Sequence, residues 1–165
     1  MSHQIQSILI IDDEEEIRTM VSAILTDKGC SVETAKSGGE AVKTSKKTSF
    51  DLALVDIKLP DADGTELLKR LREIQPKIAT IILTGQPSIE NAIKSVNNKA
   101  DGYILKPINA QTLLETIKKT LAEKTNAYSQ MFTKVERAKT STQFSNIKLQ
   151  INGTRTSSFI YFGLR

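Results

Sequence analysis

Short apolar runs closed by polar residues recur along the first two thirds of the chain. Ile8 to Ile11 and Leu52 to Val55 are continuous apolar segments without an interior polar position. Strands that are covered on both faces of a parallel sheet have this pattern, because they need not alternate. We expect five such strands, over residues 8–11, 31–35, 52–55, 78–83 and 102–105.

Apolar residues at helical spacing separate these runs. The segment from Glu14 to about Lys28 has apolar residues three and four positions apart, with its acids at the positive end of the helix dipole. A further helix opens at Asn109, whose side chain can cap it. The other expected helices cover residues 39–46, 64–74 and 88–96. This alternation predicts an α/β fold, a doubly wound five-stranded parallel sheet.

A seven-residue apolar repeat continues beyond the last strand. It runs from Leu114 to Val135 and is interrupted by Lys124. Two interpretations explain it equally well: a helix that packs on its own sheet, or an extended helix that pairs with a second subunit as a homodimer. We therefore expect a helical extension at the C-terminal side of the sheet.

Beyond Thr140 the pattern changes again. Apolar and polar residues alternate over 147–151, Asn152-Gly153 follows, and a second apolar run covers Phe159 to Phe162. Alternation on both sides of an Asn-Gly pair is typical of a β-hairpin with a type I′ turn. The sequence thus predicts a hairpin near the end of the chain.

Charge divides the chain at the same place. Residues 1–124 carry 17 basic and 18 acidic residues, whereas residues 125–165 carry six basic residues and one acid. We expect one domain over 1–124 and a basic tail over 125–165. No apolar stretch approaches the roughly 20 residues of a membrane span, and no signal-peptide pattern is present. The expected location is therefore the cytoplasm, without membrane contact.

Polar residues with distinct chemistry follow four of the predicted strands. Asp12, Asp13 and Asp56 are carboxylates, Thr84 is a hydroxyl beside a glycine, and Lys106 is an ammonium beside a proline. The carboxyl ends of parallel strands meet at one edge, so these side chains can converge. Three carboxylates favour a hard divalent cation. With the hydroxyl and the ammonium they form a pocket for a phosphoryl group.

In this order, these residues resemble the receiver domain of two-component response regulators. The resemblance covers roughly residues 5–124 and implies the flavodoxin-like receiver fold. Its matching segments are Asp12-Asp13, Asp56, the turn over 59–64, Thr84-Gly85, Tyr103 and Lys106-Pro107. The roles that follow are implied by this resemblance.

By this resemblance, Asp56 accepts a phosphoryl group from a histidine kinase or a phosphotransfer protein and becomes an aspartyl phosphate. Asp13 and Asp56 would bind Mg²⁺ directly, Asp12 would act partly through water, and the backbone carbonyl of Lys58 would add a ligand. The protein would not be an enzyme toward other substrates, since it catalyses only its own phosphorylation and dephosphorylation.

The resemblance also assigns three residues that respond to the phosphoryl group. Lys106, joined to Pro107 by a cis bond, would pair with Asp56 before phosphorylation and with a phosphoryl oxygen afterwards. The hydroxyl of Thr84 would move toward the phosphoryl group, and the ring of Tyr103 would fill the vacated space. A downstream protein target would read the altered surface.

Two functions of different classes remain. In the first, the chain is a receiver that signals through protein contacts at the face that carries Tyr103. In the second, the basic tail is a small or truncated output module that binds nucleic acid, which its cations and aromatic residues permit but no base-reading motif supports. A haloacid-dehalogenase-like phosphatase would need an aspartate two residues after Asp56, where Lys58 stands, and is discounted.

Overall fold

The computed structural model describes residues 6–85 and 100–153, with side chains described as far as residue 137. The chain divides into two compact units, Met1–Thr125 and Asn126–Arg165, which are described separately. The helix predicted over residues 88–96 lies outside the described residues. None of the helices in the described ranges is both long and apolar enough to cross a membrane.

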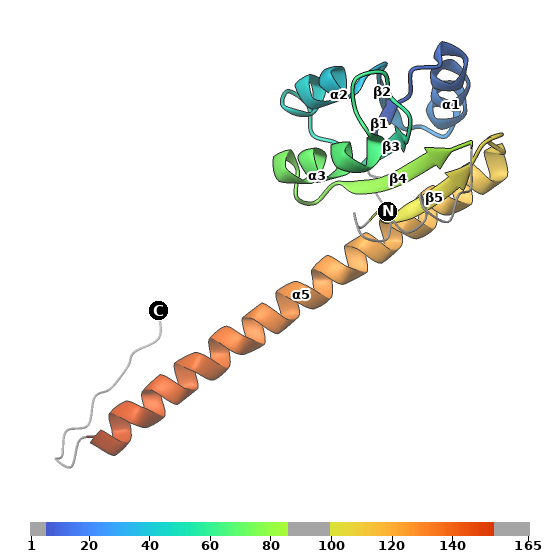
Figure 1. Cartoon of the computed structure of the whole chain (residues 1–165). Coiled ribbons are helices and arrows are strands. Elements are labelled where there is room, and N and C mark those ends of the chain that lie inside the picture. Colours follow the sequence, from blue (N-terminus) through green and yellow to red (C-terminus); the bar gives the residue numbers. More distant parts are fainter. Residues whose placement is uncertain (1–5, 86–99, 154–165) are drawn as a thin grey trace. The chain divides into compact units, whose positions relative to one another are not determined.

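A parallel sheet of five strands forms the centre of the first unit (Figure 1). Its order is β2-β1-β3-β4-β5, and every neighbouring pair is parallel. The strands are β1 (Ser7–Ile11), β2 (Ser31–Ala35), β3 (Leu52–Asp56), β4 (Ala79–Thr84) and β5 (Gly102–Leu105). Strands β3 and β4 are buried at every position, which explains their uninterrupted apolar runs. The predicted doubly wound sheet is confirmed.

Helices cover both faces of the sheet. They are α1 (Glu15–Asp27), α2 (Gly38–Ser45), α3 (Gly64–Ile74) and α5 (Ala110–Gly153). Apolar residues of α2 and α3 pack with Leu9 and Val55 on one face. Those of α1 and the first turns of α5 pack with Ile8 and Leu54 on the other. Neighbouring residues of a strand point to opposite faces, so each strand contributes to both layers of the core.

Side chains of preceding residues cap three of these helices, and Ser37 caps α2 by accepting from the amide of Glu40 at 3.2 Å. Asp63 accepts from the amide of Thr65 at 2.8 Å and begins α3. Asn109 accepts from the amides of Gln111 at 2.9 Å and Thr112 at 3.1 Å, so its predicted capping role is confirmed. These bonds satisfy amides that have no partner inside the first turn.

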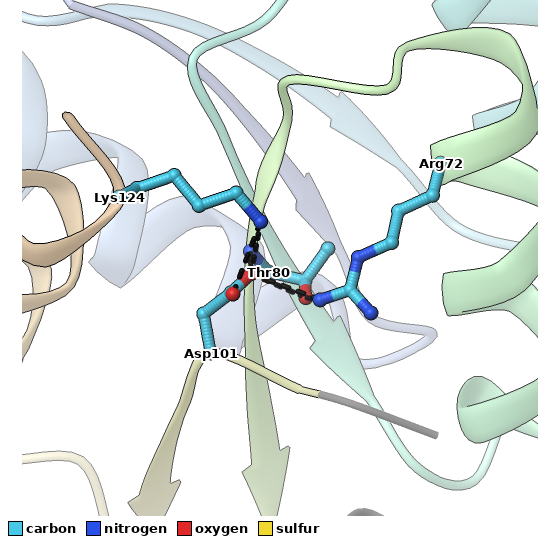
Figure 2. A network of polar contacts seen from close by, with 4 residues as sticks. All are labelled: Arg72, Thr80, Asp101 and Lys124. Atoms are coloured by element: carbon cyan, nitrogen blue, oxygen red, sulfur yellow. Dashed lines mark hydrogen bonds and ion pairs between the residues drawn. The ribbon is translucent and has the colours of Figure 1, made fainter. Parts of the chain in front are cut away.

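A partly buried polar network joins four elements at the opposite end of the sheet from the strand ends that carry Asp56 and Thr84. The carboxylate of Asp101, next to β5, accepts from Arg72 of α3 at 2.9 Å and from the amide of Thr80 in β4 at 2.9 Å. Lys124 of α5 donates to the same carboxylate at 3.1 Å (Figure 2). Arg72 also donates to the Thr80 hydroxyl at 2.7 Å. The network holds α3, β4, β5 and α5 together.

Helix α5 continues through residue 153, so the predicted helical extension is confirmed. The hairpin prediction is wrong for its first half, because residues 147–153 are helical, and Phe159 to Phe162 lie outside the described residues. The five-residue alternation over 147–151 competes with a helix that already exists, and adding a residue to a formed helix is far easier than nucleating new structure. In the second unit, Met131, Phe132 and Val135 are exposed.

Candidate phosphoryl site

The strand ends place five of the predicted residues at one edge of the sheet. Asp12 and Asp13 follow β1, Asp56 ends β3, Thr84 ends β4, and Lys106 follows β5. A cavity of about 310 Å³ opens there. It is lined by Asp13, Glu14, Asp56, Ile57, Lys58, Thr84, Gly85 and Lys106. Residues that are up to 93 positions apart in sequence thus share one cavity.

Three carboxylates form the acidic part of this site. One oxygen each of Asp12, Asp13 and Asp56 lies within 4.8 Å of the other two. Asp12 is fully buried and Asp56 is 7% exposed, whereas Asp13 faces solvent. Like charges at this separation repel one another, and burial weakens the screening by water. The cluster therefore favours a cationic partner.

The main chain of the two adjacent aspartates is fixed by α1. Arg18 donates to the carbonyl oxygen of Asp12 at 2.8 Å and to that of Asp13 at 2.9 Å. The Asp12 carboxylate in turn accepts from the amide of Glu14 at 3.0 Å. These bonds fix the orientation of Asp12 and Asp13 without a bound ligand.

Lys106 supplies the positive charge inside the site. Its Nζ lies 2.8 Å from Asp12 Oδ2, 2.9 Å from Glu14 Oε1 and 3.4 Å from Asp56 Oδ2. Burial lowers the pKa of this ammonium, but hydrogen bonds to Asp12 and Glu14 outweigh burial and hold the pKa above its usual value. Lys106 is therefore charged throughout the physiological range. The predicted cis bond between Lys106 and Pro107 is present.

The carboxyl of Asp56 is largely buried, and its pKa reflects this. Burial raises its pKa above the ordinary value, the charge of Lys106 lowers it, and the charge of Asp12 raises it again, with a net increase. Helix α3 packs directly against the main chain of Asp56, because a Cβ on Gly64, its first residue, would collide with the Asp56 carbonyl oxygen. A cation beside Asp56 would favour the ionised form, which is the nucleophilic one.

Thr84 and Tyr103 lie on the neighbouring strands β4 and β5, but only Thr84 lines the cavity. Thr84 is 6% exposed and lines the cavity. Tyr103 packs against the core face that includes α2 and α3, and burial raises the pKa of its phenol. Among the described residues, no group forms a hydrogen bond with its buried hydroxyl.

Sequence reasoning missed three residues that shape this site. The sequence pattern predicts only that Glu14 begins a helix, whereas in the structure its carboxylate binds Lys106. Arg18 was not singled out, although it holds the main chain of the acidic pair. Asp61 accepts from the amides of Gly38 and Gly39 at 2.8 Å and so joins the loop after Asp56 to α2. The contacts of Glu14 and Asp61 join residues far apart in sequence, and those of Arg18 join it to main-chain atoms five and six positions away.

The donor set fits a hard divalent cation. Three carboxylates converge, and Asp12 Oδ2 pairs with the ammonium of Lys106 at 2.8 Å. This oxygen is buried, and a metal ion beside it would add a second cationic partner. Carboxylate oxygens are the ligands that Mg²⁺ accepts in proteins.

The chain matches a known family over most of its length. Residues 8–118 match the response regulator receiver domain. The transcriptional regulatory protein ZraR of Escherichia coli (strain K12) is 33% identical over 122 residues, which are 74% of this chain and 28% of ZraR. The matched segment is thus less than a third of that relative.

Solved structures show the same architecture. A CheY-like response regulator receiver domain protein from Methanospirillum hungatei JF-1 is 42% identical, with a TM-score of 0.71 over 75% of this chain and 99% of that one. The chemotaxis protein CheY4 of Vibrio cholerae is 34% identical, with a TM-score of 0.68 over 71% of this chain and 99% of that one. Both likenesses cover nearly the whole of the other chain.

Proposed function

The chain belongs to the response regulator receiver domain family, and from this premise we propose that Asp56 is its phosphoacceptor. The donor would be a histidine kinase or a phosphotransfer protein. One observation carries the proposal: a nearly buried Asp56 carboxylate shares a cavity with two further acids and the ammonium of Lys106. Such a site lowers the energy of a transferring phosphoryl group by neutralising its charge.

The proposed step is a substitution at phosphorus. A carboxylate oxygen of Asp56 attacks the phosphorus atom and forms an acyl phosphate, while the bond from phosphorus to the donor's imidazole nitrogen breaks. The electron pair of that bond stays with the imidazole. Lys106 would neutralise a phosphoryl oxygen, and the Thr84 hydroxyl would donate to another. Because Lys106 is held charged, it needs no proton transfer to do this.

Asp12, Asp13 and Asp56, with the backbone carbonyl of Lys58, would hold Mg²⁺, which supplies charge neutralisation for the phosphoryl oxygens when bound. The convergence of the three carboxylates supports this assignment, as does the burial of Asp12 beside Asp56. Without a cation, the same carboxylates oppose the approach of a negatively charged donor.

Transmission would depend on Thr84 and Tyr103. We propose that the phosphoryl group draws the Thr84 hydroxyl toward it and that Tyr103 then settles in the inward position. The place of Tyr103 on the strand next to that of Thr84, packed against the core face of α2 and α3, supports this assignment. A downstream protein target that prefers one state would read the change.

The contacts of the second unit remain a separate proposal. Exposed Met131, Phe132 and Val135 support pairing of two copies through this part of α5. The family match covers residues 8–118 and does not include the basic tail, so the comparisons support the receiver and not a nucleic-acid-binding tail. A receiver that signals through protein contacts is therefore the function that we propose.

Phosphorylation with a small donor tests the assignment of Asp56. The full chain would be incubated with acetyl phosphate and Mg²⁺ and analysed by intact mass and by the alkali lability expected of an acyl phosphate. The parent should gain one phosphoryl group, and Asp56→Asn should gain none. Asp27→Asn is the matched control, since Asp27 is an exposed aspartate that pairs with Lys28 and should leave the reaction intact. Equal modification of Asp56→Asn and the parent would refute the proposal.

A further inference from the structure

The ammonium of Lys106 is shared among three carboxylates of unequal character. Asp12 is fully buried, Asp56 is the proposed acceptor, and the side chain of Glu14 is 60% exposed. The contact with Glu14, at 2.9 Å, is shorter than the one with Asp56, at 3.4 Å. The lysine is therefore held more closely by a residue at the rim than by the acceptor.

Glu14 stands at the mouth of the cavity. It is the residue between the acidic pair and α1, its backbone is extended, and its amide donates to Asp12 at 3.0 Å. This anchoring fixes where its side chain leaves the main chain, and the side chain lines the same cavity as Asp56 and Lys106. A donor inside the cavity therefore has this carboxylate in its surroundings.

We propose that Glu14 is a positioning residue that competes with the phosphoryl group for the ammonium of Lys106. It thereby sets how tightly the phosphorylated state is held. This inference rests on the proposed acceptance of phosphate by Asp56. Lys106 has a flexible four-carbon stem and three N–H donors, so the position of its ammonium is decided by its acceptors.

The three contacts differ in how easily they are given up. Separating Lys106 from Asp12 would leave a buried charge unpaired, which is costly. The charge of Asp56 passes to the phosphoryl oxygens on phosphorylation, and the ammonium must follow it inward. The rim contact with Glu14 is then the one that opposes the movement, and water can replace it because Glu14 is exposed. Removing this contact should favour the phosphorylated state.

Two variants separate competition for Lys106 from simple repulsion at the mouth. Glu14→Gln removes the charge and keeps the length, whereas Glu14→Asp keeps the charge and shortens the side chain by one methylene, which takes its oxygens away from Lys106. Glu16→Gln is the control, because Glu16 is exposed, lies two positions along α1 and does not line the cavity. Circular dichroism would verify that all variants are folded.

The test is the affinity for beryllium trifluoride, a tetrahedral phosphoryl mimic, in the presence of Mg²⁺. Binding would be followed by ¹⁹F NMR and calorimetry, because the chain has no tryptophan for fluorescence. Glu14→Gln and Glu14→Asp should both bind roughly threefold or more tightly than the parent, the range of a surface ion pair. Glu16→Gln should match the parent.

A second measurement needs neither the mimic nor the metal. The ¹⁵Nζ resonance of Lys106 in the free protein should shift in both Glu14 variants and stay in place in Glu16→Gln. If Glu14→Asp behaves as the parent in both measurements, the charge at the mouth is responsible and the inference is overturned. The inference is also overturned if Glu14→Gln gains no affinity for beryllium trifluoride. A parent that does not bind beryllium trifluoride at all would instead refute the proposed phosphoacceptor site itself.

Discussion

Lys124 Nζ lies 3.1 Å from Oδ1 and 3.2 Å from Oδ2 of Asp101. Lys124 interrupts the apolar repeat of α5, and its side chain is only 20% exposed. The interruption is therefore a buried anchor within the first unit. It marks where the part of α5 that packs on the receiver gives way to the part whose apolar residues are exposed.

We expect Asp101→Asn to destabilise the receiver in a pH-dependent way. Burial raises the pKa of Asp101, but the amide of Thr80 and the charges of Lys124 and Arg72 outweigh burial and lower it. A depressed folded-state pKa contributes stability above the unfolded pKa of about 4, which is lost as pH falls through the folded value. The variant should lose about 1 to 3 kcal/mol at pH 7.

Urea denaturation at several pH values measures this difference. The difference in unfolding free energy between parent and variant should narrow as the pH falls below about 4, because the Asp101 carboxylate of the parent then becomes protonated. Asp27→Asn, which removes an exposed aspartate, should be near neutral throughout. A gap that stays constant between pH 7 and pH 3 would contradict an electrostatic role for the network.

Thr84→Ala should still accept phosphate, because Asp56, Lys106 and the cation carry the chemistry. It should lose most of the coupling to Tyr103, since no hydroxyl remains to move toward the phosphoryl group. The ring resonances of Tyr103, with and without beryllium trifluoride, report this directly. Thr84→Ser keeps the hydroxyl and should restore the response. A normal Tyr103 response in the alanine variant would show that the switch pair is misassigned.

Mg²⁺ should stabilise the folded protein against heat. Binding to the native state alone adds about 1 kcal/mol when free Mg²⁺ is five times its dissociation constant. Relief of repulsion among Asp12, Asp13 and Asp56 is the physical source of that affinity. Scanning calorimetry with Mg²⁺ and then with a chelator measures the shift, which Asp13→Asn should reduce. An equal shift in both proteins would place the cation elsewhere.

The double substitution Met131→Ser with Val135→Ser should make the protein monomeric if two copies pair through α5. Both side chains are exposed in the single chain, so the change should affect association more than stability. Sedimentation at several concentrations gives the oligomeric state, with Lys134→Ser as the control. If the parent is already monomeric at high concentration, the proposal that two copies pair through α5 is wrong.

The sheet and the strand-end residues could be predicted because both leave strong local signals. Fully buried strands such as β3 have uninterrupted apolar runs, and the carboxyl ends of parallel strands must meet. Asp56 and Thr84 therefore converge by topology alone. The cap at Asn109 was predictable for a similar reason, since its partners lie two and three residues away.

The contacts that were missed depend on tertiary packing. Glu14 and Lys106 are 92 positions apart, and neither local pattern nor composition links them. The hairpin prediction failed because the alternation over 147–151 is too short to decide between a strand and the end of a long helix. Propagation of α5 decided it. Local rules thus predicted the scaffold, while the pairing of Glu14 with Lys106 needed the structure.

Helix α3 meets the acceptor at one end and the Asp101 network at the other. Gly64 at its start leaves no room for a side chain beside the Asp56 carbonyl, and Arg72 near its end donates to Asp101. Eleven helical residues form a stiff rod of roughly 16 Å. A displacement of the Asp56 main chain would therefore have a direct route along the axis of α3 to the network that anchors α5, separate from the carboxylates of the site.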